Sequence, residues 1–263
     1  MNNNFVRVAG VALAVGLSSL VAHAQIGQQF TGSGTYVGNG GTGFGGTVGS
    51  GSLSLAYSGG TVNGSFTPGA NFTGNALVLY IGTGALGIAD TSTLTDTADG
   101  GRTAISGFNS GNSTRTLASF PAGFRPSYAI AIEPTFAGLF NLSTPSNFGF
   151  VANTGLAGSG TGPFTFSFTV ANLGLSAATS NNIDFVGSLI STSAYRANET
   201  IGTSTTVSGT PGDVPNAGFT GSQTFTTFNR LTTFAPVVIP EPATMLLMGA
   251  ALPGIALIRR RRK

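Results

Sequence analysis

The sequence predicts an all-β protein, a β-sandwich of jelly-roll or lectin-like type with eight or more strands. Apolar and hydroxyl side chains alternate along residues 163–170, so that Phe164, Phe166 and Phe168 share one face of an extended segment. Glycine-rich turns such as residues 58–60 separate runs of this kind. The body lacks the apolar spacing of an amphipathic helix over three turns. With 20 Phe and no Trp, phenylalanine is the expected core aromatic.

Residues 1–24 have the pattern of a secretory signal peptide. A weakly basic start leads into the apolar run 8–20, which is too short for a comfortable membrane-spanning helix. Ala22 and Ala24 are the small residues that a signal peptidase reads, so we expect cleavage before Gln25. The expected partners of this segment are the general secretion machinery and signal peptidase.

Residues 25–51 are rich in Gly, Ser and Thr and hold few bulky apolar side chains. We expect them to stay loose or to form an arm at an edge of the sandwich. Residues 52–234 form the predicted body, which is long enough to bury a core as one domain or two. A loop is expected at 210–218 and a short spacer at 235–238.

Seven apolar or alternating segments of the body are predicted strands or hairpins. They are residues 53–66 (a hairpin about the turn at 58–60), 76–81, 128–132, 136–142, 163–170, 183–190 and 224–234.

The C-terminal residues 239–263 combine three features, each with a physical role. They are the motif Pro240, Glu241 and Pro242, the uncharged run 243–258, and the basic cluster Arg259, Arg260, Arg261, Arg262 and Lys263. The prolines keep the motif extended. As a helix, the uncharged run would reach roughly 24 Å, less than the hydrocarbon core of about 30 Å, so we expect a marginal single transmembrane helix. The basic cluster would stay cytoplasmic.

This tail resembles the PEP-CTERM sorting signal of exported proteins of Gram-negative bacteria. By that resemblance Pro240, Glu241 and Pro242 are the recognition motif, residues 243–258 a temporary inner-membrane anchor, and the basic end a membrane-retention cluster. The implied processing partner is an exosortase, a membrane-embedded protease with a cysteine nucleophile that often accompanies exopolysaccharide production. The implied destination is the cell surface or the extracellular space. The alternative is a permanent anchor that is never cleaved.

The charge of the chain is unevenly distributed. The whole sequence has a net charge of +3, whereas residues 25–238 hold five basic and seven acidic residues, a net charge of −2, and no Lys. Such a body has no basic patch to neutralise phosphates, so a nucleic-acid partner is excluded. Sparse charge also leaves strand edges unprotected, which favours self-association.

The residue types present exclude several classes of enzyme. The chain has no Cys, and its single histidine, His23, lies in the predicted signal peptide. Thiolate nucleophiles, Cys-ligated metals and Ser-His-Asp catalysis are therefore excluded. Glu133, Asp184 and Glu199 are candidate carboxylates for glycoside hydrolysis, but no local pattern selects two of them. We predict no enzyme activity and no cofactor.

Three weaker motifs have ordinary structural alternatives. Asp90, Asp96 and Asp99 could supply oxygen ligands to Ca²⁺, or could cap turns of a solvated loop. The glycine spacing of residues 82–87 matches a dinucleotide-binding loop, but no helix pattern follows it, which favours a plain turn. Arg196 and Glu199 are expected to join a structural polar contact near a strand end.

Together these patterns predict an exported surface or extracellular-matrix protein with a structural or interaction role in a polysaccharide-rich envelope or biofilm. A carbohydrate-binding β-sandwich module is the alternative, since extracellular polysaccharide would be its natural partner. Sugar sites rely on aromatic stacking and hydrogen bonds. Because Tyr57, Tyr80 and Tyr128 fall in apolar strand patterns, we expect them in the core.

Overall fold

The computed structural model describes residues 26–33, 51–68, 72–84, 87–159, 162–203, 205–209 and 216–233. The predicted signal peptide, the spacer and the whole tail 239–263, with its expected transmembrane helix, lie outside these residues. Within the described part of the chain, no helix is long and apolar enough to cross a membrane.

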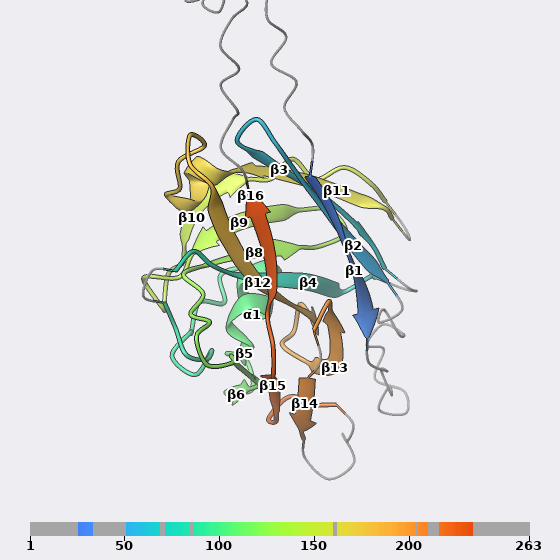
Figure 1. Ribbon diagram of the computed structural model, residues 1–263. Helices are drawn as coiled ribbons and strands as arrows, with labels where there is room; N and C mark the ends of the chain where they lie inside the picture. The colour runs from blue at the N-terminus through green and yellow to red at the C-terminus, as the bar shows by residue number, and fades with distance from the viewer. Residues whose placement is uncertain are drawn as a thin grey trace, which may run out of the picture. The chain divides into compact units, whose positions relative to one another are not determined.

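The described residues form mainly β-sheet, as predicted, with an eleven-stranded sheet as the largest unit (Figure 1). Its strands are β1 (Ile26–Ser33), β2 (Ser52–Ser58), β3 (Thr61–Thr67), β4 (Asn75–Gly82), β8 (Tyr128–Ile132), β9 (Ala137–Asn141), β10 (Gly149–Asn153), β11 (Phe164–Thr169), β12 (Asn181–Ser191), β13 (Arg196–Ile201) and β16 (Asn229–Thr233). They run in the order β10-β9-β8-β4-β12-β13-β1-β2-β3-β11, and β16 pairs with β12. All of these pairings are antiparallel.

Strand β1 corrects the expectation of a loose or edge-lying arm. Residues 26–31 pair with β2, and Gly32 and Ser33 pair with Ile201 and Thr200 of β13. The strand therefore lies inside the order and joins its two halves. Backbone pairing with two neighbours stabilises a segment whose own side chains give little β signal. Residues 34–50, the rest of the predicted arm, lie outside the described residues.

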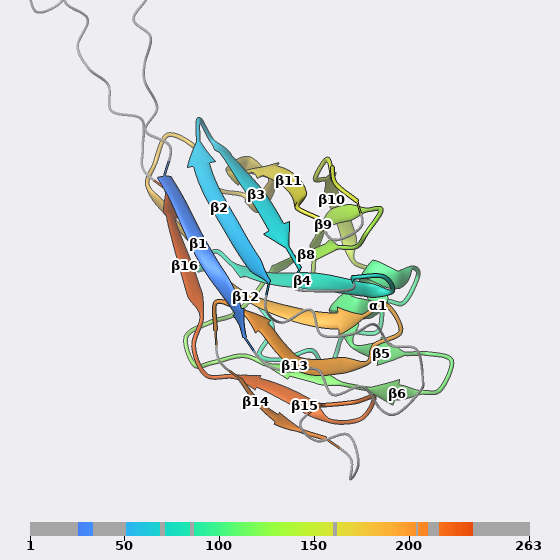
Figure 2. The same ribbon diagram turned by 90° about the vertical axis from the view of Figure 1, so that its right-hand side faces the viewer.

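The sheet folds over so that its halves face each other as sandwich-like layers. Figure 2 shows β2, β3 and β11 on one side of β4 and β12, and β14 (Thr205–Ser208) and β15 (Ser222–Phe225) on the other, while β1 runs from the first side past β12 to β13. The segment after β10 joins the two ends of the strand order, since Thr154 N donates to Ala137 O of β9 and Ala157 pairs with Thr165 of β11.

Strand β4 separates two hydrophobic cores. Leu77, Leu79 and Ile81 point into the core that β2, β3 and β11 close, while Val78 and Tyr80 point into a second core. All eight of its residues are buried, which explains why its sequence is continuously apolar instead of alternating. The two-residue side-chain period of a strand makes both packings possible.

The second core includes residues of a short helix, α1 (Gly100–Ser106), and of the strands β7 (Leu117–Ser119) and β15 (Ser222–Phe225). β7 and β15 form a three-stranded sheet with β14 (Thr205–Ser208), and β5 (Phe108–Asn109) pairs with β6 (Thr114–Arg115) in a two-stranded sheet. The sequence pattern missed α1 because its seven residues are too short for a helical period. The predicted strand 224–234 is in fact two strands, β15 and β16.

Candidate functional site

A pocket of about 720 Å³ opens where β4, β8 and β9 meet the turn that follows β11. That turn is the 3₁₀ helix η1 (Val170–Leu173), which a capping box at Thr169 fixes and which ends at Gly174. The polar lining residues lie at or next to strand ends, and Leu173 and Leu175 form part of the apolar wall of the pocket. Binding residues are often carried at strand ends and on the adjoining loops, where a rigid sheet positions them.

Tyr128 and Asn141 line the pocket from two neighbouring strands. They lie directly opposite each other, because Tyr128 begins β8 and Asn141 ends β9. Asn141 Oδ1 accepts a hydrogen bond from the backbone N–H of Ser143 at 2.8 Å, which fixes the orientation of the amide. The Tyr128 hydroxyl faces Gly174, where an added Cβ would lie 3.8 Å from it. Both side chains therefore have defined positions at the pocket.

The polar groups of the pocket have hydrogen-bonding capacity to spare. Among the described residues, no protein group bonds to the side chains of Thr83, Tyr128 or Ser143, or to the Asn141 amide nitrogen. Ser127 Oγ is buried at the wall without a partner among the described residues. No described lining residue is charged. The pocket thus offers neutral donors and acceptors beside an aromatic ring and leucine side chains.

This site corrects one expectation about the tyrosines. Tyr57 and Tyr80 are buried in the cores as expected, at 4% and 0% exposure. Tyr128 is only partly buried: it packs against the core that β2, β3 and β11 close, and it also lines the pocket. Sequence reasoning missed Asn141, Ser143 and the 173–175 turn, since only the sheet topology brings them to Tyr128.

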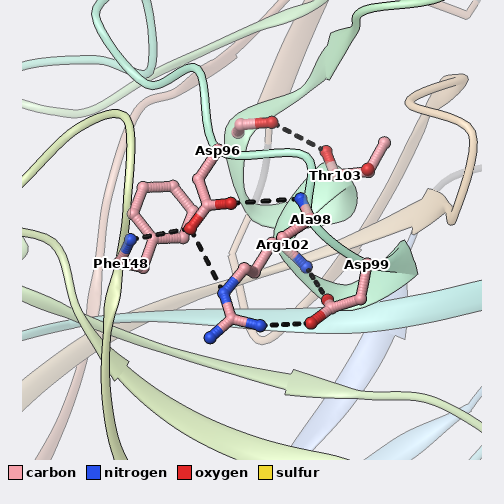
Figure 3. A network of polar contacts seen from close by, with 7 residues as sticks. Asp96, Ala98, Asp99, Arg102, Thr103 and Phe148 are labelled. Atoms are coloured by element: carbon pink, nitrogen blue, oxygen red, sulfur yellow. Dashed lines mark hydrogen bonds and ion pairs between the residues drawn. The ribbon is translucent and has the colours of Figure 1, made fainter.

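The three aspartates of the calcium hypothesis are used in other contacts. Asp96 Oδ2 lies 3.2 Å from Arg102 Nε and accepts from Phe148 N at 2.7 Å (Figure 3). Asp99 caps α1 by accepting from Arg102 N at 2.8 Å and also pairs with the Arg102 guanidinium. Asp90 caps a turn at Ser92. Among the described residues, no group of three acidic or histidine side chains could hold a metal ion. The contacts that the structure gives these aspartates are turn and helix caps and ion pairs with Arg102.

The other candidate carboxylates are dispersed. Asp184 of β12 forms a forked pair with Arg230 of β16, with contacts of 2.6 and 2.9 Å. Glu133 lies beside the start of α1, where burial raises its carboxyl pKa above the ordinary value of 4.5. The charge of Asp99 raises that pKa further, and the Gly101 N–H opposes the shift. Glu199 is buried in β13.

Arg196 forms a fully buried polar contact, as the sequence predicted for this position, at the start of β13. Its guanidinium donates to Ser188 Oγ, to Gln223 Oε1 at 3.4 Å and to the Tyr80 hydroxyl at 3.3 Å. Burial raises the pKa of Tyr80, and Arg196 opposes that shift. These contacts tie β4, β12 and β15 together, so the role of Arg196 is structural.

The glycine spacing at 82–87 is not followed by a helix in the described chain, since the next helix begins at Gly100. Gly87 instead approaches the backbone closely, because an added Cβ would lie 2.2 Å from Pro126 O. A dinucleotide site needs a helix N-terminus at this point, so the plain turn is the better description.

The C-terminal tail lies outside the described residues, so its assignment depends on sequence comparison. Residues 238–263 match the PEP-CTERM protein-sorting motif. The PEP-CTERM assignment that Pro240, Glu241 and Pro242 predicted is thereby confirmed. Neither the curated proteins nor the solved structures contain a match to the chain.

The PEP-CTERM motif implies an exported protein, a transient membrane anchor and an exosortase as processing partner. The match covers only the tail, so it assigns the route of the chain and leaves the β-sheet body to be interpreted from its own residues. The pocket of Tyr128 and Asn141 is a candidate site in the described part of that body.

Proposed function

We propose that the protein is a non-enzymatic component of the cell surface or extracellular matrix, with a structural or interaction role in a polysaccharide-rich envelope or biofilm. The PEP-CTERM motif is the main support for this proposal, because it implies that the protein is exported. The net negative charge of residues 25–238 adds support, because it does not suit binding to nucleic acid. The contacts of Asp96, Asp99 and Asp184 with arginines support a structural use of the acidic residues.

The proposed route has two processing steps. Signal peptidase cleaves after Ala24, so that Gln25 becomes the N-terminus. Residues 243–258 then hold the chain in the inner membrane while the cluster 259–263 stays cytoplasmic. An exosortase cuts near Pro240 to Pro242 and releases the body to the surface or the medium.

The intact mass of the exported protein tests this route. The expected product runs from about Gln25 to near Pro240. Glu241→Ala should block processing and retain the precursor in the membrane fraction, whereas the neighbouring Ile239→Val should be processed normally because it leaves the motif unchanged. A mature wild-type chain that still contains Lys263 would overturn the route in favour of a permanent anchor.

The proposed interaction role includes self-association, with a second copy pairing at β10. This strand ends the sheet order, carries no charged residue and presents Phe150, which is 52% exposed beside Phe136 and Phe140. Two uncharged edges can pair antiparallel without like-charge repulsion. Phe150→Lys should then shift light scattering toward monomer. A wild-type protein that is monomeric at high concentration contradicts the proposal.

The alternative function is a carbohydrate-binding module on a lectin-like sandwich. The pocket of Tyr128 and Asn141 favours it, because neutral polar groups beside an aromatic ring suit sugars. Pulldown of the protein by the producer's own polysaccharide distinguishes the two functions. Binding supports the module, whereas secretion or biofilm defects without glycan affinity support the purely structural role.

A further inference from the structure

We infer that the pocket of Tyr128 and Asn141 is a binding site for an uncharged sugar unit of a polysaccharide, an inference that rests on the alternative function proposed above. Its volume of about 720 Å³ accommodates a small oligosaccharide segment. The exposed Ser143 and Gly174 lie at its rim, so a polymer can continue beyond the occupied unit.

The donors and acceptors of the pocket match the hydroxyl groups of a sugar. Sugar hydroxyls both donate and accept, and so do the hydroxyls of Thr83, Tyr128 and Ser143. The Asn141 amide nitrogen adds two donor hydrogens, while its oxygen is already engaged by Ser143 N. The Tyr128 ring and the nearby Leu175 can cover the apolar C–H face of the sugar.

The absence of charge among the described lining residues selects the class of sugar. A uronic acid or sulfated sugar would bring an anion into a partly enclosed site without a cation to pair with it, and that desolvation is costly. A neutral hexose has no such penalty. Screening by salt acts on charges, so binding should not depend on ionic strength.

Gly174 keeps the pocket open. It ends η1 with a left-handed φ of 71°, a conformation that favours glycine. An added Cβ would lie 3.8 Å from the Tyr128 hydroxyl, so a side chain there would occupy the space next to the ring. The cap that ends the 3₁₀ helix thus also leaves room for a ligand.

The test measures binding of the exported, processed protein to polysaccharide purified from the producing cells, to neutral glucan and mannan oligosaccharides, and to oligogalacturonate as the acidic probe. Calorimetry at low and high salt gives the affinities. Asn141→Asp keeps the acceptor for Ser143 N but removes two donor hydrogens and adds a charge. Tyr128→Phe keeps the ring and removes the hydroxyl.

A matched control is Asn182→Asp. Asn182 is exposed in β12, outside both the pocket and β10, and its Oδ1 accepts a hydrogen bond from Thr232 Oγ1 at 3.2 Å, which an aspartate can also accept. We expect a neutral oligosaccharide to bind the wild type and Asn182→Asp equally. Asn141→Asp should weaken binding about tenfold or more, and Tyr128→Phe by a few-fold, at unchanged thermal stability.

The results distinguish a wrong assignment of the pocket from a wrong assignment of carbohydrate binding. If the wild type binds neither the purified polysaccharide nor any of the oligosaccharides, carbohydrate binding and the pocket assignment are both wrong. If the wild type binds a neutral glycan and both pocket variants bind it equally well, the function stands but its site lies elsewhere. Preference for oligogalacturonate, with affinity that falls as salt rises, overturns the assignment to an uncharged sugar.

Discussion

Asp96 and Arg102 form an ion pair in which the carboxylate is almost fully enclosed, with 4% of its side chain exposed and 3.2 Å between Oδ2 and Nε. The same carboxylate accepts the backbone N–H of Phe148 at 2.7 Å and of Ala98 at 3.1 Å. The Arg102 guanidinium also lies 4.8 Å above the Phe140 ring. This pair therefore fixes the start of α1 against the β9–β10 connection.

Replacing Asp96 with Ala should lower the free energy of unfolding by about 2–4 kcal/mol, because it leaves the Phe148 N–H without its buried acceptor and removes the buried ion-pair partner of Arg102 Nε. Urea denaturation measures the loss. Asp96→Asn, which keeps one acceptor oxygen, should cost less than Ala.

The control for this loss is Asp184→Ala, which breaks an ion pair with the exposed Arg230. Exposed pairs add little to stability, so the urea midpoint should hardly move. Equal effects of the two alanine variants would show that burial does not decide the strength of these pairs.

Gly64 is required by the ring of Phe166, its cross-strand partner on β11. An added Cβ would lie 2.2 Å from Phe166 Cζ, far inside van der Waals contact. Gly64→Ala should therefore displace the ring and cost about 1–3 kcal/mol of stability through overpacking. Thermal or urea unfolding measures the change.

Gly149→Ala is the matched strand control for that substitution. An added Cβ at Gly149 has its nearest neighbour, Asn141 Cβ, at an ordinary 3.7 Å. We expect no loss of stability there, and a small gain from the less flexible unfolded chain is consistent with the argument. A loss as large as that of Gly64→Ala contradicts the packing explanation.

The sequence predicts those parts of the fold whose signal is local. The hairpin of β2 and β3 follows from alternation about the turn at Gly59 and Gly60, and β11 follows from its Phe and Thr alternation. Residues 128–132 form β8 with the predicted bounds. In each case neighbouring residues alone determine which face is buried.

The parts that the sequence did not predict depend on partners distant in the chain. Strand β1 pairs with the nearby β2 over residues 26–31, but its place inside the sheet also needs β13, in the pairing of Gly32 with Ile201, 201 − 32 = 169 residues further along the chain. The pocket requires β8, β9 and the η1 turn to meet, and only the strand order brings Leu173 to Tyr128. The capping signals Asp99 and Gly107 could have revealed α1.

Glu133 gives the fold a dependence on pH whose sign follows from its raised pKa. Between its ordinary pKa of 4.5 and the higher folded-state value, the folded chain binds more protons at Glu133 than the unfolded chain does. Stability therefore falls as pH rises through this window, and the charged carboxylate, half-buried and close to Asp99, is unfavourable at neutral pH.

Glu133→Gln should raise the melting temperature at neutral pH, and the difference from wild type should vanish below the ordinary pKa, where the wild-type carboxyl is also neutral. The glutamine oxygen can still accept the hydrogen bond from the Gly101 N–H, which in the wild type opposes the rise in the Glu133 pKa.

Asp99→Asn is the matched comparison, because it keeps an α1 N-cap while removing the neighbouring charge. Removing the charge of Asp99 should bring the folded-state pKa of Glu133 closer to its ordinary value. The pH range in which Glu133 makes stability fall should therefore become narrower, but it should not disappear, because burial is the larger cause of the raised pKa. Melting curves across acidic to neutral pH measure both effects, and a Glu133→Gln protein that is less stable than wild type at neutral pH would contradict the expected sign.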